Sequence, residues 1–317
     1  MFVPMEIVLA PAAPPLQKSA RPHYERAIAP PAIRLTDRDR AVIAAIHDYD
    51  GILADYQLRA MFFHDERYFM ERMSFLFHNG YVAKPDRQRR AQLKYTVYWL
   101  DKTGAELLAG QQGTPYGEFK WRRPYERWNQ VTHDVQTNDV RLAVTKALEP
   151  LPTYHLLEWA SERDFHRHPD QVEYVDKNGA KQKRLQYPDG YFLLGWDNPG
   201  TQKRDKLRFL LEFDRGKHSG ISFADEKVRP GMAYIQSPQF KARFGYNAGR
   251  WLVVIDTPDS ALRLSFLKER TEAINMPDIK AFFFTTFEAV MTRNMLIDPI
   301  WQQAGITGAP VALLKTS

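Results

Sequence analysis

The sequence contains no cysteine, and this absence excludes several kinds of chemistry at once. A chain without thiols forms no disulfide, has no thiolate nucleophile and holds no zinc or iron–sulfur cluster through sulfur. Long apolar runs are also missing, because no stretch approaches the roughly 18 uninterrupted apolar residues of a membrane span. The first residues lack the charged and apolar regions of a secretion signal. We therefore expect a cytoplasmic protein without membrane contact.

The composition is that of an ordinary globular protein with a basic balance. A length of 317 residues predicts two domains, because one domain usually takes about 100–200 residues. Hydrophobic residues make up 44% of the chain, and 7 Trp, 15 Tyr and 19 Phe are enough to fill substantial cores. The formal net charge of +6 is compatible with a nucleic-acid partner.

Changes in composition and periodicity divide the chain into four segments. Residues 1–33 contain APAAPP and APPA, which suit neither helix nor strand and predict a disordered tail. Residues 34–112 predict a winged-helix DNA-binding domain, and residues 113–130 predict a basic and aromatic linker. Residues 131–317 predict an α/β domain.

The element order in 34–112 is typical of a winged helix-turn-helix. A first helix starts after Thr36, where Asp39 completes a capping box, and a second lies in ADYQLRAMFF. A third is predicted over DERYFMERMSFLFH and ends at Gly80. The strand-like segments YVAKP and QLKYTVYWLD then flank the basic sequence DRQRR, which predicts a wing.

Basic side chains of this segment are the candidate DNA contacts. Arg87, Arg89 and Arg90 lie at the predicted wing tip, where phosphates or the minor groove would lie. Arg67 and Arg72 lie on the third helix, where they alternate with acidic residues; this suits backbone contact better than base readout. The alternative is a small helical domain whose hairpin binds protein.

The linker interleaves cations with aromatic rings in GEFKWRRPYERW. Lys120, Arg122 and Arg123 would contact phosphates of a nucleic-acid strand while the neighbouring rings stack on bases. Alternatively, the rings seal the joint between two domains.

From residue 131 onward the pattern predicts helix, strand, strand, strand, helix and strand. The helix covers 131–149, and strands follow in YHLLEWASERDF, YPDGYFLLGW and KLRFLLEFDRG. After a mixed segment come RWLVVIDT, a helix in SALRLSFLKERTEAI and the strand AFFFTTF. Strands buried on both faces with helices between them predict an α/β sandwich with a mixed sheet.

Three carboxylates stand at the ends of the two most apolar predicted strands. Side chains alternate along LRFLLEFD, so Glu212 and Asp214 share one face at its C-terminal end. Asp189 would approach them from the neighbouring strand. Such carboxylates raise one another's pKa, and a divalent cation such as Mg²⁺ or Mn²⁺ removes that penalty. Alternatively, each acid pairs with a neighbouring Arg or Lys.

PDG followed by an apolar strand that ends in Glu-x-Asp resembles the PD-(D/E)XK restriction-endonuclease-like nucleases. Together with the winged helix, H-x-x-x-x-x-D-V-R and W-x-x-E, the arrangement resembles the replication-relaxation family over roughly residues 34–300. This family includes the MobC-type relaxases of mobile elements. The resemblance implies a PD-(D/E)XK nuclease-like fold for residues 131–317, with Asp189, Glu212 and Asp214 as its metal-binding acids.

The resemblance also suggests Glu162 as a further catalytic acid. Asp139 shares one face of the predicted helix with Val135, Leu142 and Ala143, and such nucleases often keep an extra acid at that inward position. Structural ion pairs are the alternative for both acids. The nuclease motif ends in Lys, but Asp214 occupies that position here. We expect Lys227 to supply the missing cation, with Lys217 as the second choice. If neither reaches the acids, the domain would be a weak or inactive nuclease.

The predicted function is therefore a metal-dependent DNA endonuclease or nickase resembling relaxases. Its expected partners are DNA and other DNA-processing or mobilisation proteins. Two alternatives remain open: a non-enzymatic DNA-binding regulator with a degenerate nuclease fold, and an adaptor that docks partner proteins. His166 and His168 in FHRHPD are interpreted as part of a polar loop, with a role as metal ligands as the alternative.

Overall fold

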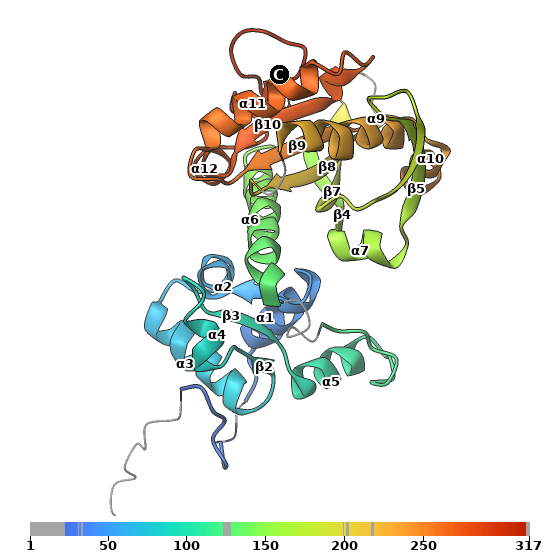
Figure 1. The fold of residues 1–317 in the computed structure, drawn as a ribbon. Helices are drawn as coiled ribbons and strands as arrows, with labels where there is room; N and C mark the ends of the chain where they lie inside the picture. The colour runs from blue at the N-terminus through green and yellow to red at the C-terminus, as the bar shows by residue number, and fades with distance from the viewer. Residues whose placement is uncertain are drawn as a thin grey trace, which may run out of the picture.

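The computed structural model describes residues 23–30, 32, 34–122, 128–198, 200, 203–216 and 219–314. Most of the predicted tail, together with Arg123 and Lys217, lies outside the described residues. The described part is a mixed α/β structure built on a six-stranded sheet, with smaller antiparallel sheets beside it (Figure 1).

The N-terminal elements form a group of helices on a three-stranded antiparallel sheet of order β1-β3-β2. A short helix, α4, lies in the connection between β2 and β3, where the sequence predicts a loop. The elements are α1 (Asp37–Asp48), β1 (Leu53–Ala54), α2 (Asp55–Phe62), α3 (Glu66–His78), β2 (Val82–Ala83), α4 (Arg87–Arg90), β3 (Val97–Leu100) and α5 (Lys102–Gln111).

The predicted ends of these helices are confirmed. Thr36 caps α1, and the capping box with Asp39 is present. Gly80 follows the C-cap of α3 with φ of +77°, a conformation that glycine adopts without strain. The apolar faces of α1 and α3 meet in one buried cluster through Val42, Ile46 and Phe69.

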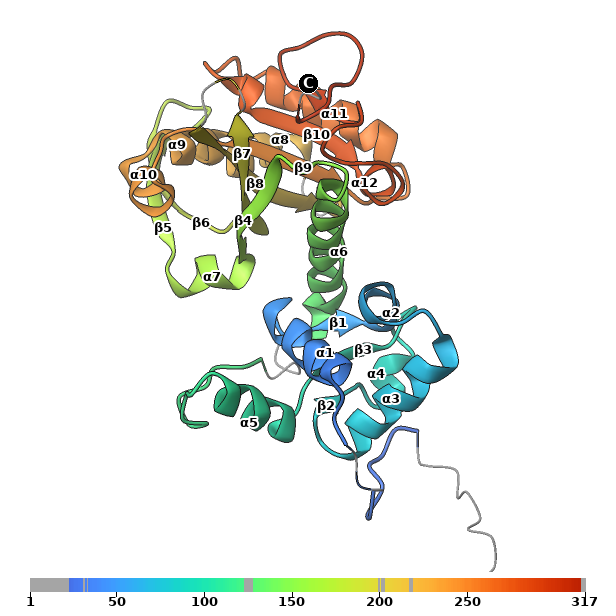
Figure 2. The same ribbon diagram turned by 180° about the vertical axis from the view of Figure 1, so that it is seen from behind.

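Helix α6 (Val131–Leu148) runs from the N-terminal elements to the six-stranded sheet (Figures 1 and 2). Its first turns pack Val131 and Val135 against β1 and β3. Its later turns pack Val140 and Val144 against the large sheet. The predicted helix over 131–149 is confirmed, and it belongs to both cores.

The six-stranded sheet has the order β11-β10-β9-β8-β7-β4. Strands β8, β9 and β10 are parallel, whereas β4, β7 and β8 are antiparallel neighbours, so the predicted mixed sheet is confirmed. The strands are β4 (Tyr154–Ser161), β7 (Gly190–Asn198), β8 (Lys203–Asp214), β9 (Arg250–Ile255), β10 (Phe282–Thr286) and β11 (Gln302–Gln303).

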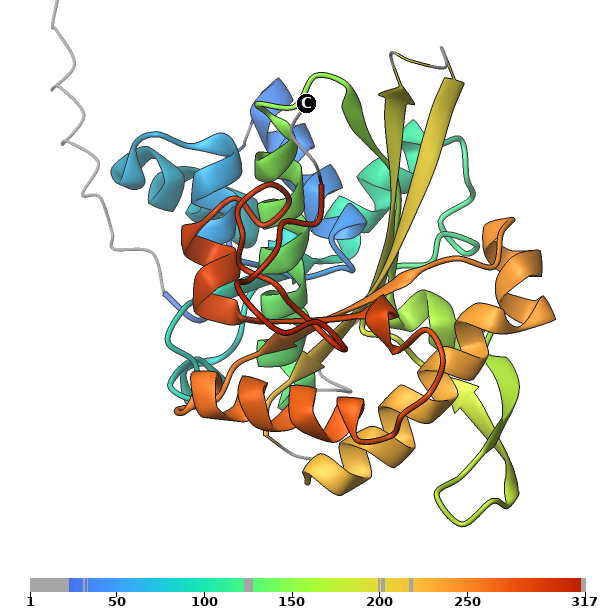
Figure 3. The ribbon, with the colours of Figure 1, turned by 90° about the horizontal axis from the view of Figure 1, so that it is seen from above.

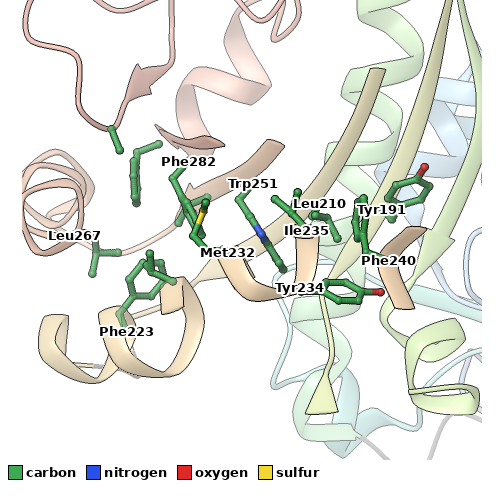
Figure 4. Close-up of a cluster of buried hydrophobic side chains, with 14 of the residues drawn as sticks. Tyr191, Leu210, Phe223, Met232, Tyr234, Ile235, Phe240, Trp251, Leu267 and Phe282 are labelled. Carbon is green, nitrogen blue, oxygen red and sulfur yellow. The ribbon is translucent and has the colours of Figure 1, made fainter. Parts of the chain in front are cut away.

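Helices cover both faces of this sheet. Phe209, Leu211 and Phe213 of β8 pack in the cluster that contains residues of α6 and α12 (Phe287–Thr292). Leu210 joins the opposite cluster, drawn in Figure 4, with α8 (Gly220–Phe223), η2 (Ala224–Val228), α9 (Arg229–Gln236) and α11 (Ser260–Glu272). Figure 3 shows α6 and α11 on opposite sides of the sheet. The alternation predicted for this strand is confirmed.

Several elements were not predicted, and most of them have few buried apolar residues. The hairpin of β5 and β6 is largely exposed, with Val172 buried among polar neighbours. No helix of the described residues is long and apolar enough to cross a membrane. The added elements are β5 (Asp170–Val175), β6 (Lys181–Gln186), α7 (Glu162–Arg167), α10 (Pro238–Phe244) and η3 (Ile279–Ala281).

Candidate functional site

A polar cavity of about 170 Å³ lies where β7 begins and β8 ends. Strand pairing of Gly190 with Leu211 brings these two chain segments together. Helix α6 contributes its first turn, α7 its first residue and η2 one cation. We call it the catalytic cavity because the sequence analysis selects Glu162, Asp189, Glu212 and Lys227 as candidate catalytic residues, and all four line it together with His133.

Asp189 is held from two sides. Its Oδ2 accepts a hydrogen bond from the backbone N–H of Phe213 at 2.6 Å. Its Oδ1 lies 3.2 Å from Nε2 of His133. The backbone N–H of Asp189 also donates to the carbonyl of Leu211 at 2.9 Å. The position of the carboxylate is therefore fixed by the end of β8.

Lys227 contacts Glu212. The sequence analysis expects this lysine to supply the cation that the nuclease motif lacks here. Its Nζ lies 2.6 Å from Oε1 of the buried Glu212. The lysine stands in the π-helical segment η2, and Pro230 occupies the first turn of the following α9, where proline is tolerated. Short π-helical segments occur frequently at functional sites.

His133 is the site residue that the sequence analysis did not select. It lies in the first turn of α6, and its ring meets Phe213 edge-on at 6.1 Å between centroids. The motif H-x-x-x-x-x-D-V-R contains this histidine, but the apolar face of the predicted helix selects Asp139 instead. The two residues lie on different sides of α6, and His133 is the one that faces Asp189.

Three of these side chains have the arrangement of a metal site. Ligand atoms of His133, Glu162 and Asp189 all lie within 4.8 Å of one another. Glu162 also lies 3.1 Å from His166, which stacks on Tyr187. One imidazole and two carboxylates offer ligands that first-row divalent cations accept.

Burial and mutual charge set the protonation of the cavity. Burial would raise the pKa of Asp189, but His133 and Lys227 hold that pKa below its ordinary value. Burial would lower the pKa of His133, but the neighbouring Asp189 carboxylate outweighs this effect and raises the pKa of His133 to about 9. Burial raises the pKa of Glu212 to about 7 against the opposing charge of Lys227. Near neutral pH Asp189 is therefore a carboxylate, His133 and Lys227 are cations, and Glu212 is close to its midpoint.

Asp214 does not share this arrangement, although it stands at the rim of the catalytic cavity. Both of its oxygens are taken by Arg263 of α11, at 2.8 Å from Nε and 3.0 Å from Nη2. The side chain is 2% exposed. Its assignment as a metal ligand therefore gives way to the alternative, an ion pair with a neighbouring arginine.

We expect Asp214→Ala to lower the free energy of unfolding by about 3 kcal/mol, because it removes the carboxylate that neutralises a largely buried guanidinium. Denaturant unfolding followed by circular dichroism measures this. Asp205→Ala, which removes an exposed acid from the same strand, should change stability by less than ~0.5 kcal/mol. Equal stabilities for the two variants would contradict the structural role.

Asp139 lies outside the catalytic cavity. It accepts hydrogen bonds from the hydroxyl of Tyr56 and from Nε2 of Gln57, both at 2.7 Å. These partners belong to α2, and all three residues line a different cavity, of about 530 Å³. The predicted catalytic acid therefore connects α6 to the N-terminal elements.

The protonation of Asp139 gives a pH-dependent prediction. Burial raises its pKa to about 6 from 3.8, so the stability it contributes is full below 3.8 and is lost as pH rises through 6. Asp139→Asn stays neutral and can still bond Gln57 and Tyr56. At pH 8 the variant should be more stable than the wild type by up to ~3 kcal/mol, at about 1.4 kcal/mol per pKa unit. Urea unfolding at pH 4 and pH 8 checks this, with the exposed Asp259→Asn as control.

The candidate DNA contacts divide into exposed and paired residues. Arg67, Arg87 and Lys120 are exposed. Arg89 pairs with Asp86 at 2.7 Å and remains partly exposed. Arg90 lies in α4, between β2 and β3, and donates to Thr96 and to the carbonyl of Leu93.

Two of the candidates are structural. Arg72 pairs with Asp39, the carboxylate of the α1 capping box, and so joins α3 to α1. Arg122 is buried against Asp134 of α6. Gly51, with φ of +79°, lets Arg122 approach, because a Cβ there would lie 2.4 Å from the Cβ of Arg122. Both arginines are corrected from DNA contacts to internal ion pairs.

The chain has a mixed α/β fold with a cavity of ionisable side chains at one end of the sheet. Its sequence also matches a known family. Residues 48–247 match the family described as Replication-relaxation. The match covers more than half of the chain and includes all five residues of the catalytic cavity named above. The chain therefore belongs to the replication-relaxation family. A search of curated proteins finds no match.

Proposed function

We propose that the protein binds DNA and hydrolyses a phosphodiester bond with the help of a divalent cation, as a nickase. The observation that carries this proposal is the convergence of His133, Glu162, Asp189, Glu212 and Lys227 in one cavity. Membership of the replication-relaxation family supports a substrate of DNA.

The arrangement of elements supports the finer assignment of both parts. Asp189 before β7, Glu212 near the end of β8 and a cation beside them are the parts that a PD-(D/E)XK nuclease requires. The N-terminal order of helix, strand, two helices and two further strands, paired as β1-β3-β2, is the order of a winged helix. Exposed Arg67 and Arg87 would contact phosphates, which positions DNA without reading its sequence.

The residues of the catalytic cavity fit a divalent cation. His133, Glu162 and Asp189 would hold it, and when bound it would lower the pKa of a water and neutralise charge on the phosphate. The set of ligands is mixed: carboxylates suit Mg²⁺ and Mn²⁺, whereas imidazole is typical of transition metals. We therefore infer that Mn²⁺ supports the activity better than Mg²⁺.

The chain's own groups have separate tasks in this proposal. The N–H of Phe213 keeps the Asp189 carboxylate oriented toward the centre of the cavity. Glu212, with its pKa of about 7, is suited to accept a proton from the attacking water near neutral pH. Lys227 would stabilise negative charge that develops on the phosphate oxygens.

The test is to incubate supercoiled plasmid with the protein in Mn²⁺, Mg²⁺ or EDTA. We expect open-circular product with Mn²⁺, less with Mg²⁺ and none with EDTA. DNA binding in EDTA should weaken steeply with salt if phosphates are contacted. Nicking that persists unchanged in EDTA would contradict the metal-dependent mechanism.

One observation favours the alternative of a DNA-binding regulator. Both central acids already have cationic partners, Asp189 in His133 and Glu212 in Lys227. If plasmid, including plasmid with the transfer origin of the element that encodes the protein, is bound and never nicked, these pairs are structural and the regulator is the better account.

A further inference from the structure

A second polar cavity, of about 390 Å³, lies beside the catalytic cavity. It is enclosed by the end of α1, the segment 120–122, the middle of α6, the end of β4 and α7. We call it the basic cleft, because its lining includes Lys120, Arg122, Arg141, Arg163 and Arg167.

The basic cleft and the catalytic cavity are neighbours. A narrow gap is lined by Asp50, Trp159 and Ser161 of the cleft and also by Glu162 and Asp189 of the catalytic cavity. The consecutive residues Ser161 and Glu162 thus stand on the border between the two. A strand with its phosphate in the catalytic cavity could continue into the cleft.

Three of the five cations in the cleft are matched by carboxylates. Arg122 pairs with Asp134, as described above. Arg163 lies 3.5 Å from the Asp50 carboxylate, and Arg167 lies 2.9 Å from the Asp164 carboxylate. These pairs form the frame of the cleft.

The other two cations, Lys120 and Arg141, make no ion pair with a carboxylate of the described residues. Lys120 is exposed. Arg141 is half-buried and donates to the carbonyl of Asp48 at 2.5 Å. Its guanidinium lies over the rings of Tyr49, at 4.1 Å, and Trp159, at 5.6 Å. The carboxylates of Asp48, Asp50 and Asp164 lie near enough to act on its charge, but none of them forms an ion pair with it, so an anionic ligand would supply a direct partner.

Aromatic surface accompanies this charge. Trp121 and Trp159 both line the cleft. The ring of Trp159 is already stacked on Phe192 at 5.7 Å and has the Arg141 guanidinium over it, so Trp121 is the ring that would meet a base. Cations beside aromatic rings are the combination that binds single-stranded nucleic acid, with phosphates on the cations and bases stacked on the rings. A cavity of about 390 Å³ falls in the range of small-ligand sites, roughly 300–1,000 Å³, and holds a nucleotide rather than a duplex.

We propose that the basic cleft binds one unpaired nucleotide of the DNA strand next to the phosphodiester that is cut. Lys120 and Arg141 bind its phosphate, and Trp121 stacks on its base. The substrate is then a strand that is locally single-stranded at the site of cleavage. This inference rests on the proposed nuclease function for the position of the strand, but binding to the cleft needs no catalysis.

The experiment measures binding of fluorescent single-stranded and duplex oligonucleotides by anisotropy in EDTA, where cleavage is excluded. Lys120→Glu changes an exposed side chain, and we expect it to weaken single-strand binding at least about 10-fold and to reduce the salt slope by roughly 0.7 per lost phosphate contact. Arg141→Gln should act in the same direction. Duplex binding should change by less than about two-fold, because it depends on the N-terminal elements.

The matched control is Lys206→Glu, an exposed lysine near the start of β8, at the end of the strand away from the catalytic cavity. It should leave single-strand binding unchanged. If Lys206→Glu and Lys120→Glu weaken single-strand binding equally, the weakening comes from the overall charge of the protein. That result would overturn the proposal.

Photo-crosslinking to the unaltered protein provides a readout that does not depend on the folding of a variant. A single strand carrying 5-iodouracil should crosslink to a peptide that contains Trp121. Crosslinks confined to other peptides would overturn the proposal. If a mononucleotide competes as well as the oligonucleotide does, the cleft is a site for free nucleotides. The proposal that it binds a DNA strand is then overturned.

The two hypotheses fail separately. If the protein cleaves DNA but Lys120→Glu leaves its single-strand affinity unchanged, the nuclease hypothesis stands and the cleft proposal is wrong. Single-strand binding that depends on Lys120, without cleavage of any DNA, would retain the cleft and remove the nuclease.

Discussion

Asp189→Asn is expected to abolish metal-dependent nicking, with a loss of more than about 100-fold, since even groups that merely support a metal ligand contribute roughly 10–100-fold. The amide preserves the shape of the side chain, and its oxygen can still accept from the N–H of Phe213. What it removes is the negative charge that lies 3.2 Å from His133 and contributes to the proposed cation site. The rate of conversion of supercoiled to open-circular plasmid in Mn²⁺ measures the loss.

Folding and DNA binding must be shown to survive in the same variant. The thermal midpoint should stay close to that of the wild type, and DNA affinity in EDTA should stay within a few-fold. Asp197→Asn is the matched control, because Asp197 is a partly exposed acid at the other end of β7 that pairs with Arg204 and His155. Nicking by Asp189→Asn at the wild-type rate would remove Asp189 from the reaction and shift the proposal toward a regulator.

The Mn²⁺ affinity of the two proteins adds a second readout. Asp189 raises the pKa of His133 to about 9, so binding of a cation at neutral pH has to displace a proton from the imidazole. Affinity in the wild type should therefore increase as the pH rises toward 9. In Asp189→Asn this pH dependence should move to lower pH, while the affinity itself falls because one carboxylate ligand is lost.

Local patterns in the sequence predicted most of the elements that build the site. The capping box at Thr36, the helix over 131–149 and the alternation along β8 are confirmed because each depends on neighbours in sequence. The meeting of Asp189 with the end of β8 also follows, since an antiparallel pair of strands places the start of one beside the end of the other.

Predictions failed where a partner comes from a distant element. Asp214 was grouped with Glu212 by strand alternation, but Arg263 arrives from α11 and takes both of its oxygens. The sequence analysis assigns Arg72 of α3 to DNA contact. In the structure Arg72 pairs instead with Asp39, the carboxylate of the α1 capping box. Charge patterns in a sequence indicate which residues are ionic, and they do not indicate whether the counter-ion is a phosphate or a carboxylate of the same chain.

The choice between His133 and Asp139 shows the same limit within one helix. Both belong to α6, which crosses from one core to the other, so it is buried on different sides along its length. A single apolar face was assumed for the whole helix, and that face selected Asp139. In the structure Asp139 faces α2, whereas His133 faces the end of the sheet. Asp139 does face inward, but its neighbour there is α2 and not the end of the large sheet.

Lys227→Met is expected to reduce nicking by about 100–1,000-fold, the usual effect of removing one fixed group that stabilises transition-state charge. Two effects combine in this loss. The ammonium that would stabilise the phosphate is gone, and Glu212 loses the partner that opposes the raising of its pKa by burial. Glu212 should then stay protonated above pH 7 and no longer accept a proton from water.

The pH dependence separates these two contributions. Because the raised pKa of Glu212 moves further upward in Lys227→Met, the stability of the variant should be nearly unchanged at low pH and should fall, relative to the wild type, as the pH rises through 7. Nicking that recovers at pH 9, when Glu212 ionises, would assign Lys227 to the control of Glu212. Nicking that stays low at every pH would assign it to the phosphate.

Lys177→Met is the matched control for this variant. Lys177 lies 3.7 Å from Asp225 of the same π-helical segment, and its side chain is 57% exposed, so the substitution removes a neighbouring surface charge without entering the catalytic cavity. It should leave the nicking rate within about two-fold, because exposed ion pairs contribute little. If Lys177→Met and Lys227→Met reduce nicking equally, then the basic surface as a whole, rather than the cation at Glu212, supports the reaction.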